Sequence, residues 1–405
     1  MHCKHFGVCG GCSLPAVPYA EQLLRKQARL TQLLGLPVPP LIPSPREDRF
    51  RSKSAFVFGP EGQGRGLVMG HYAARSKQIV RIDECPVHSD RANRIAFALR
   101  DRLIRARIYG AGAQRNGLVR HIIVRATADD RQAVAMLVVT RNDKALRTPI
   151  RSLLASADRP DGFYINIHDK PGPYMVGAET IRIDGHSHVK ETIEWEAGSG
   201  LRAPGSGKTP TSYLVSPTAF FQTNVGAARE LVQLVVGGAS GNPKEGLPPH
   251  SREATKAPPV VLDLYSGSGL FALPIAQTGA RVTAVEENRQ AVKDAEANIR
   301  LNRIPAGQVR LLCSRVEDAL PRLTAEKWDA VVLDPPRQGC PPAVLAGVFE
   351  TIAPRVAIYI SCNPDALAQD LPVILKAGYR VTLLQAVDMF PHTDHIETVA
   401  VFTRG

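Results

Sequence analysis

The chain has 405 residues, of which 44% are hydrophobic and 22% are charged, and these values exclude a disordered or fibrous protein. No run of about 18 apolar residues is present, so we expect no transmembrane helix. Lys and Arg exceed Asp and Glu by 50 − 38 = 12, which favours a polyanionic partner, most commonly nucleic acid. The first residues, from Met1 to His5, lack the apolar core of a signal peptide, and we therefore expect a cytoplasmic protein.

Four cysteines form a pattern that is typical of a metal centre: Cys3, Cys9, Cys12 and Cys85. The chain has seven cysteines, and an odd number in a cytosolic protein argues against a disulfide framework. Three clustered thiols plus a distant one followed by proline are a usual layout for an iron–sulfur cluster. Zinc also accepts four thiolates, and it stays the second candidate because spare ligands lie nearby at His2, His5 and His88.

An amphipathic helix is predicted over residues 19–34. Its leucines define an apolar face: Leu23, Leu24, Leu30, Leu33 and Leu34. Arg25, Lys26 and Arg29 lie elsewhere, on a face that we interpret as solvated, and Gly35 ends the helix. Residues 1–45 are thus expected to form a cysteine-rich metal-binding segment and one helix.

Residues 46–215 read as an α+β region. Alternating polar and apolar residues predict strands at 52–58, 119–126, 133–140 and 162–167. Apolar residues three or four positions apart predict helices at 89–107 and 144–157. Arginines recur along this region, interleaved with aromatic residues such as Phe50 and Phe56. Basic and aromatic side chains together suit unpaired RNA, so we expect a central RNA-binding domain that also supplies Cys85.

Residues 216–405 read as a doubly wound α/β domain. An apolar strand from Val260 to Leu264 runs into a glycine-rich turn ending at Gly269, and glycines there allow positive φ and close approach of a ligand. The next strand ends at Glu286, where such sheets bind ribose hydroxyls, although a glycine pair alone also fits an ordinary turn. Further strands are expected near 309, 330, 357 and 381, and residues 237–259 read as a flexible insertion. The fold class is therefore α/β, with a Rossmann-like carboxy-terminal domain, the α+β central domain and the cysteine-rich segment.

Three candidate catalytic or binding groups lie at the ends of strands in this domain. Asp334 opens the motif Asp-Pro-Pro-Arg, at the sheet edge that lines a ligand crevice. Cys362 ends the next strand, where an exposed thiolate could add to carbon 6 of a pyrimidine; a buried structural cysteine is the alternative. Glu397 precedes the last strand and is the best candidate for a general base, ahead of Asp394 and His395.

Taken in order, these motifs resemble the bacterial RNA 5-methyluridine methyltransferases, which include the 23S ribosomal RNA enzymes and the tRNA enzyme. The resemblance rests on the amino-terminal cysteines, Phe220-Phe-Gln-Thr-Asn224, the glycine turn, Asp-Pro-Pro-Arg, Ser-Cys-Asn-Pro and His-Ile-Glu. It implies Cys362 as the nucleophile and Glu397 as the base. It further implies a four-iron four-sulfur cluster on the four patterned cysteines, and S-adenosylmethionine bound by Gln222, Tyr265, Glu286 and Asp334.

The resemblance also ranks the substrates. The cysteine motif favours 23S ribosomal RNA over tRNA, because the tRNA enzyme generally lacks the cluster. An RNA 5-methylcytosine methyltransferase is a rival, but such enzymes typically place a second cysteine where this chain has Arg337. A non-catalytic, metal-containing RNA-binding protein is the rival of a different class, and the presence of Asp334, Cys362 and Glu397 argues against it. We expect a monomer.

Overall fold

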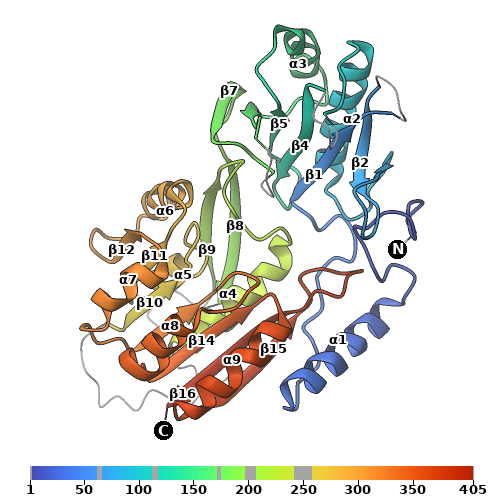
Figure 1. Ribbon diagram of the computed structural model, residues 1–405. Helices are drawn as coiled ribbons and strands as arrows, with labels where there is room; N and C mark the ends of the chain where they lie inside the picture. The colour runs from blue at the N-terminus through green and yellow to red at the C-terminus, as the bar shows by residue number, and fades with distance from the viewer. Residues whose placement is uncertain are drawn as a thin grey trace.

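A computed structural model describes residues 2–61, 66–111, 117–170, 175–196, 207–240 and 258–404. Within these residues the strands form two seven-stranded sheets and one two-stranded sheet. Figure 1 shows the amino-terminal sheet above the carboxy-terminal sheet, with the two-stranded hairpin between them. None of the described helices is long and apolar enough to span a membrane.

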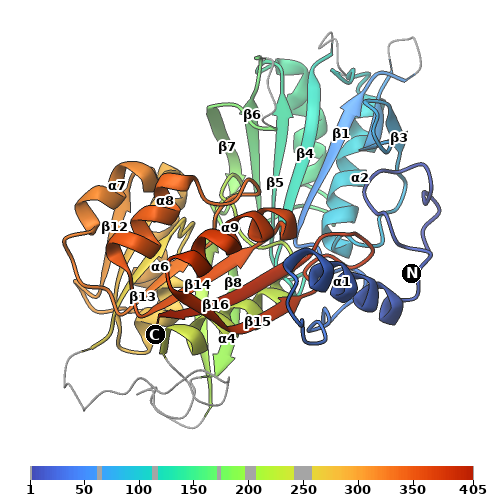
Figure 2. The same ribbon diagram turned by 60° about the horizontal axis from the view of Figure 1, so that its bottom comes forward.

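Helix α1 (Tyr19–Leu34) has the predicted bounds and ends at Gly35, whose φ is 64°. Its buried face differs from the predicted leucine face, because the buried residues are Gln22, Lys26, Leu30 and Leu34. Leu24 is 64% exposed. The helix lies beside α9 (Pro364–Lys376) and β15 (Tyr379–Val387) of the carboxy-terminal domain, as Figure 2 shows. Two polar side chains therefore face a protein neighbour, and the interpretation of Lys26 as solvated is wrong.

The central sheet has the strand order β3-β2-β1-β4-β5-β6-β7. Its strands are β1 (Lys53–Gly59), β2 (Val68–Tyr72), β3 (Ile79–Arg81), β4 (Val119–Ala126), β5 (Ala133–Val139), β6 (Gly162–Ile167) and β7 (Glu179–Gly185). Helices α2 (Asp90–Arg105) and α3 (Arg147–Leu154) pack on it, and α3 follows a 3₁₀ turn at Lys144–Leu146. Phe56 is fully buried, so this aromatic residue belongs to the core and is not a stacking platform.

The hairpin of β8 (Val189–Glu196) and β9 (Lys208–Val215) alternates buried and exposed residues. Its buried members, including Trp195 and Tyr213, pack in the core beneath the carboxy-terminal sheet. Asn298 of helix α6 (Arg289–Leu301) and Asn302, which follows that helix, accept hydrogen bonds from the β9 backbone at 2.6 and 2.8 Å. The predicted boundary near residue 215 thus follows a hairpin that is attached to the carboxy-terminal side, and the domain division stays a prediction.

The carboxy-terminal sheet has the strand order β12-β11-β10-β13-β14-β16-β15. Its strands are β10 (Val260–Leu264), β11 (Arg281–Glu286), β12 (Val309–Cys313), β13 (Ala330–Leu333), β14 (Val356–Ser361), β15 (Tyr379–Val387) and β16 (Glu397–Arg404). Strand β16 pairs antiparallel with both β14 and β15, whereas β10 to β14 are mutually parallel. This arrangement confirms the predicted α/β, Rossmann-like fold class.

Helices cover both faces of this sheet. One core contains residues of α4 (Val225–Ser240) and α5 (Ala272–Gln277), with α6 (Arg289–Leu301) on the same side. The other core contains residues of α1, α7 (Val316–Leu323), α8 (Pro342–Ala346), a π-helical turn (Gly347–Ile352) and α9 (Pro364–Lys376). The predicted insertion at 237–259 lies mostly outside the described residues, and its first residues continue α4.

Candidate active site

A cavity of about 880 Å³ opens at the carboxyl ends of β10, β11, β13 and β14. It is lined by every residue that the sequence assigned to the cofactor or to catalysis: Gln222, Tyr265, Glu286, Asp334, Cys362 and Glu397. Parallel strands end at one edge of their sheet, and chain segments that are distant in sequence meet there. The structure thus brings these side chains together, while their individual roles stay predictions.

The glycine-rich turn holds Glu286 in place. Tyr265, Gly267 and Gly269 have φ values of 65°, 57° and 91°, so the chain reverses sharply after β10. The Gly267 N–H donates to Glu286 Oε2 at 2.9 Å, and the Asn288 N–H donates to Oε1 at 2.7 Å. Each carboxylate oxygen can accept a second hydrogen bond, so Glu286 is positioned to bind a pair of hydroxyls at the cavity wall.

Buried acids concentrate around this cavity. Burial, followed by the charges of Asp334 and Glu286, raises the pKa of Asp263 well above its usual range. Burial and the charge of Glu286 raise the pKa of Asp334 to about 7. Such a site favours a cationic ligand, because a positive charge would offset the repulsion among the carboxylates.

Cys362 lies half-buried at this cavity. Burial, followed by the charges of Glu397 and Asp334, raises the pKa of its thiol to about 11, and the Arg337 guanidinium opposes that rise. Asn363 Nδ2 donates to the Arg337 carbonyl at 2.9 Å, and this bond ties the loop after β14 to the loop after β13. The thiol is therefore accessible to a bound molecule and is not the packed structural cysteine considered as the alternative.

Glu397 stands at the start of β16 and is buried. Burial and the charge of Asp334 raise its pKa well above the usual range, and Arg337 partly offsets the rise. His395 also lines the cavity, whereas Asp394 is exposed and does not. A carboxylate whose pKa is raised is a stronger base than a solvated one. The place of Glu397 at the cavity and its raised pKa therefore favour it over Asp394.

A second cavity, of about 310 Å³, is lined by all four patterned cysteines: Cys3, Cys9, Cys12 and Cys85. The Gly10 N–H donates to the Tyr72 carbonyl at 2.9 Å, which docks the cysteine segment on the end of β2. A Cβ on Gly10 would stand 2.9 Å from the backbone nitrogen of Ala74, so this close approach requires glycine.

The thiols perturb one another in this cavity. Burial raises the pKa of Cys12 to about 11, and the neighbouring Cys9 and Cys3 add to the rise. Burial likewise raises the pKa of Cys85 to about 12, with Cys12 contributing. A bound metal centre would relieve this cost by stabilising the thiolates, so the four cysteines fit such a group.

Histidines also reach this cavity. Among the described residues, one group of three places its ligand atoms within 4.8 Å of one another: His71, Cys85 and His88. The Nδ1 atom of His88 is buried without a hydrogen-bond partner among the described residues. Zinc accepts imidazole nitrogens as well as thiolates, so these histidines add possible zinc ligands beside the four cysteines.

Comparisons with known proteins identify the family. Residues 252–404 match the family described as tRNA (Uracil-5-)-methyltransferase. A protein of Gloeobacter violaceus named as an RNA methyltransferase is 32% identical over 98% of this chain and 81% of its own length. The chain belongs to the RNA uracil-5 methyltransferase family.

Other relatives extend over the whole chain as well. An RNA methyltransferase of Geobacter sulfurreducens is 30% identical over 99% of this chain and 77% of its own length. The crystal structure of the Pyrococcus abyssi tRNA (uracil-54, C5)-methyltransferase in complex with S-adenosyl-L-homocysteine has a TM-score of 0.76. At 24% identity it covers 98% of this chain and 86% of its own, and it shows that the fold is shared.

Some cavity residues of this methyltransferase were missed by the sequence reasoning. Phe220 is 67% exposed at the cavity, and Phe390 lies there with the Arg51 guanidinium carbon 5.9 Å from its ring centroid. An aromatic residue in a sequence is more often core than surface, so only exposure could have singled out Phe220. Cys340 is buried in the core, so it does not take the place of the second cysteine that the cytosine enzymes carry.

Proposed function

We propose that this chain methylates carbon 5 of a uridine in RNA, with S-adenosylmethionine as the methyl donor and Cys362 as a covalent nucleophile. One observation carries the proposal: Cys362 and Glu397 line the same cavity as the residues expected to bind the donor. Family membership supports RNA methylation at the coarser level.

The cofactor would bind at the acidic side of the cavity. The two fixed oxygens of Glu286 suit the ribose hydroxyls. Gln222 and Tyr265 would contact the rest of the molecule from the cavity wall. The sulfonium carries a positive charge, which the carboxylate of Asp334 would stabilise. Burial raises the pKa of Asp334 to about 7, so the nearby cation would in turn favour the ionised form of Asp334.

The chemistry requires two proton transfers and one covalent adduct. The Cys362 thiol releases its proton to solvent and the thiolate adds to carbon 6, so that the pyrimidine becomes an enolate with a nucleophilic carbon 5. A bound S-adenosylmethionine would supply the methyl group to carbon 5 and would leave as neutral S-adenosylhomocysteine. Glu397 then removes the proton from carbon 5, the carbon–sulfur bond breaks, and 5-methyluridine leaves with the thiolate restored.

The four cysteines would hold a four-iron four-sulfur cluster, with zinc as the second candidate. The methyl transfer needs no electron, so the group would supply structure, tying the amino-terminal segment to β2 and the loop of Cys85. The thiol cavity lies beside the central sheet, which we propose as the RNA-binding domain.

The substrate would be an unpaired uridine, because the base must leave its stack to reach Cys362, which costs a few kcal/mol in a duplex and less in a loop. We propose 23S ribosomal RNA ahead of tRNA, since the cysteine motif resembles the ribosomal RNA enzymes. A monomer acting in the cytoplasm accords with this proposal.

Two variants test the mechanism. Cys362→Ala is expected to abolish methylation while S-adenosylmethionine binding, measured by calorimetry, stays near that of the wild type. Glu397→Gln is expected to trap a protein–RNA adduct that migrates slowly on a denaturing gel. Cys313→Ala, at an exposed cysteine on β12, is the matched control and should retain activity. Full methylation by Cys362→Ala would remove the covalent mechanism.

The target base and RNA are tested separately. Tritium release from RNA labelled at carbon 5 of uracil, and none from RNA labelled at carbon 5 of cytosine, would support a uridine enzyme over a cytosine enzyme. Mass-spectrometric mapping of 5-methyluridine in ribosomal and transfer RNA from a deletion strain would identify the RNA. Loss of the modification from tRNA alone would contradict the ribosomal assignment.

A further inference from the structure

The segment that leads to Glu397 has an unusual conformation. Residues 388–396 connect β15 to β16, and Phe390 and His395 of this segment line the active-site cavity. His392 has a φ of 65°, in the left-handed region that a residue with a Cβ rarely adopts. Such a conformation persists only where neighbouring groups hold it, so the contacts of this segment determine where Glu397 stands.

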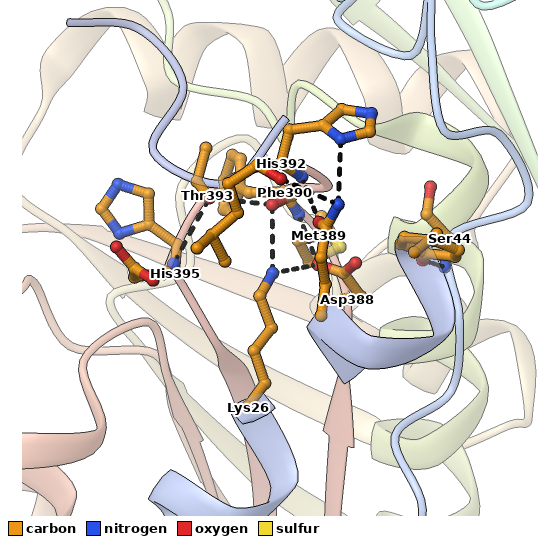
Figure 3. Close-up of polar contacts among 12 residues, drawn as sticks. Lys26, Ser44, Asp388, Met389, Phe390, His392, Thr393 and His395 are labelled. Carbon is orange, nitrogen blue, oxygen red and sulfur yellow. Dashed lines mark hydrogen bonds and ion pairs between the residues drawn. The ribbon is translucent and has the colours of Figure 1, made fainter. Parts of the chain in front are cut away.

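Helix α1 holds the beginning of the segment through a buried ion pair. Lys26 Nζ lies 2.7 Å from Asp388 Oδ1 and donates to the Phe390 carbonyl at 3.1 Å. The side chains of Lys26 and Asp388 are 2% and 0% exposed. Figure 3 shows Lys26 rising from its helix to meet Asp388 and the backbone of Phe390. One ammonium group thus bridges both sides of the turn after β15.

Residues of the amino-terminal region also hydrogen-bond to the backbone and side chain of His392. Its N–H donates to Gln22 Oε1 at 2.8 Å, and its Nδ1 lies 3.2 Å from Gln22 Nε2. Its carbonyl accepts hydrogen bonds from the Ser13 and Leu14 N–H groups, each at 2.9 Å. Its Nε2 lies 2.8 Å from the Glu47 carbonyl. Every polar group of this strained residue is therefore paired with residues that precede the central sheet.

We propose that Gln22 and Lys26 are positioning residues for the proton-abstraction step, because they fix the segment that carries Glu397. The inference rests on the proposed function. Neither side chain lines the active-site cavity, whose wall includes Glu286 and Asp334. Their loss should therefore leave cofactor binding and the addition of Cys362 in place and slow the release of the adduct.

The experiment uses the full-length protein with its metal content measured in every variant. Lys26→Met/Asp388→Asn removes both charges of the pair and keeps the shapes of the side chains, and Gln22→Met removes the contacts to His392 while keeping the ion pair. Arg25→Met, at an exposed neighbour on the same helix, is the matched control. Each variant is assayed for S-adenosylmethionine affinity, methyl transfer in a single turnover, and the covalent adduct on a denaturing gel.

Folded positioning variants should bind S-adenosylmethionine as the wild type does and accumulate the adduct, with turnover slowed about tenfold or more, toward the 10²–10⁴-fold contribution of a general base. Arg25→Met should behave as the wild type. Equal losses of adduct formation and turnover, or wild-type turnover, would overturn the proposal. Unfolding of both positioning variants would also overturn it, by assigning the contacts to folding alone.

Glu397→Gln in the same assay distinguishes a failure of the positioning role of Gln22 and Lys26 from a failure of the proposed function. An adduct with Glu397→Gln but none with the positioning variants would refute only the role of Gln22 and Lys26. Absence of the adduct with Glu397→Gln, together with activity of Cys362→Ala, would refute the proposed function itself.

Discussion

The reactivity of Cys362 in the free enzyme can be calculated from its surroundings. Burial and the charges of Glu397 and Asp334 raise the pKa of the thiol to about 11. At pH 8, about one such side chain in a thousand is a thiolate, against about a quarter of free cysteine molecules with a pKa of about 8.5. A thiolate of higher pKa is more nucleophilic, with a Brønsted slope of about 0.4–0.5, which recovers about a factor of ten. We therefore expect Cys362 to react with iodoacetamide about twentyfold more slowly than free cysteine at pH 8.

The assay follows alkylation of individual cysteine peptides by mass spectrometry between pH 7 and pH 10. The rate at Cys362 should increase about tenfold for each pH unit with no plateau below about pH 10, because its thiol stays protonated over that range. The exposed Cys313 serves as an internal reference in the same sample. Arg337→Gln should slow the reaction further, because the guanidinium is the charge that lowers the pKa of Cys362.

A plateau near pH 8 in the free enzyme would refute this reasoning, since it would mean that the thiolate is already stabilised. If the expected slope is found, the stabilisation needed for catalysis must come with the ligands. A bound sulfonium is one source, because its positive charge would stand near the acids that raise the pKa of Cys362.

Further predictions concern stability and loop geometry. Asp334 has a folded pKa of about 7, above the unfolded value of about 3.9, so stability is lost as pH rises from about 4 to about 7. Urea denaturation should show that Asp334→Asn lacks this loss, which is at most about 4 kcal/mol. Lys26→Met should cost about 3–5 kcal/mol in urea denaturation, because it leaves the buried Asp388 charge unpaired; a loss below 1 kcal/mol would argue against the ion pair. Gly339→Ala should cost about 1–2 kcal/mol and lower activity, since Gly339 has a φ of 81° and its Cβ would stand 3.0 Å from Asp370 Oδ2. Gly307→Ala, at a φ of 78° with nothing within 4 Å, should cost similar stability but keep full activity.

Strand ends explain why the candidate site could be predicted from sequence. Asp334 and Cys362 each follow a short apolar strand, and Glu286 ends another. A parallel sheet brings such positions to one edge, so local pattern sufficed to predict a long-range arrangement. The bounds of β4 and β6 agree with the predicted strands because both are apolar segments flanked by turns.

The remaining features depend on partners that no local pattern reveals. Lys26 occupies a helix position that reads as solvated, yet Asp388 neutralises it in the interior. The burial of Gln22 likewise depends on His392. Strand β7 is exposed along most of its length, so it lacks the apolar alternation that predicts a strand. Hydrophobic periodicity thus cannot predict a buried polar residue such as Lys26 or Gln22, because the partner that allows its burial is distant in sequence.

The ion pair of Lys26 and Asp388 joins positions that are 362 residues apart. A helix the length of α1 is marginal on its own in water, so it gains its partners only after the segment before β16 has left the ribosome. The segment before Glu397 can therefore take up its active-site conformation only late in biosynthesis, when both ends of the chain are present.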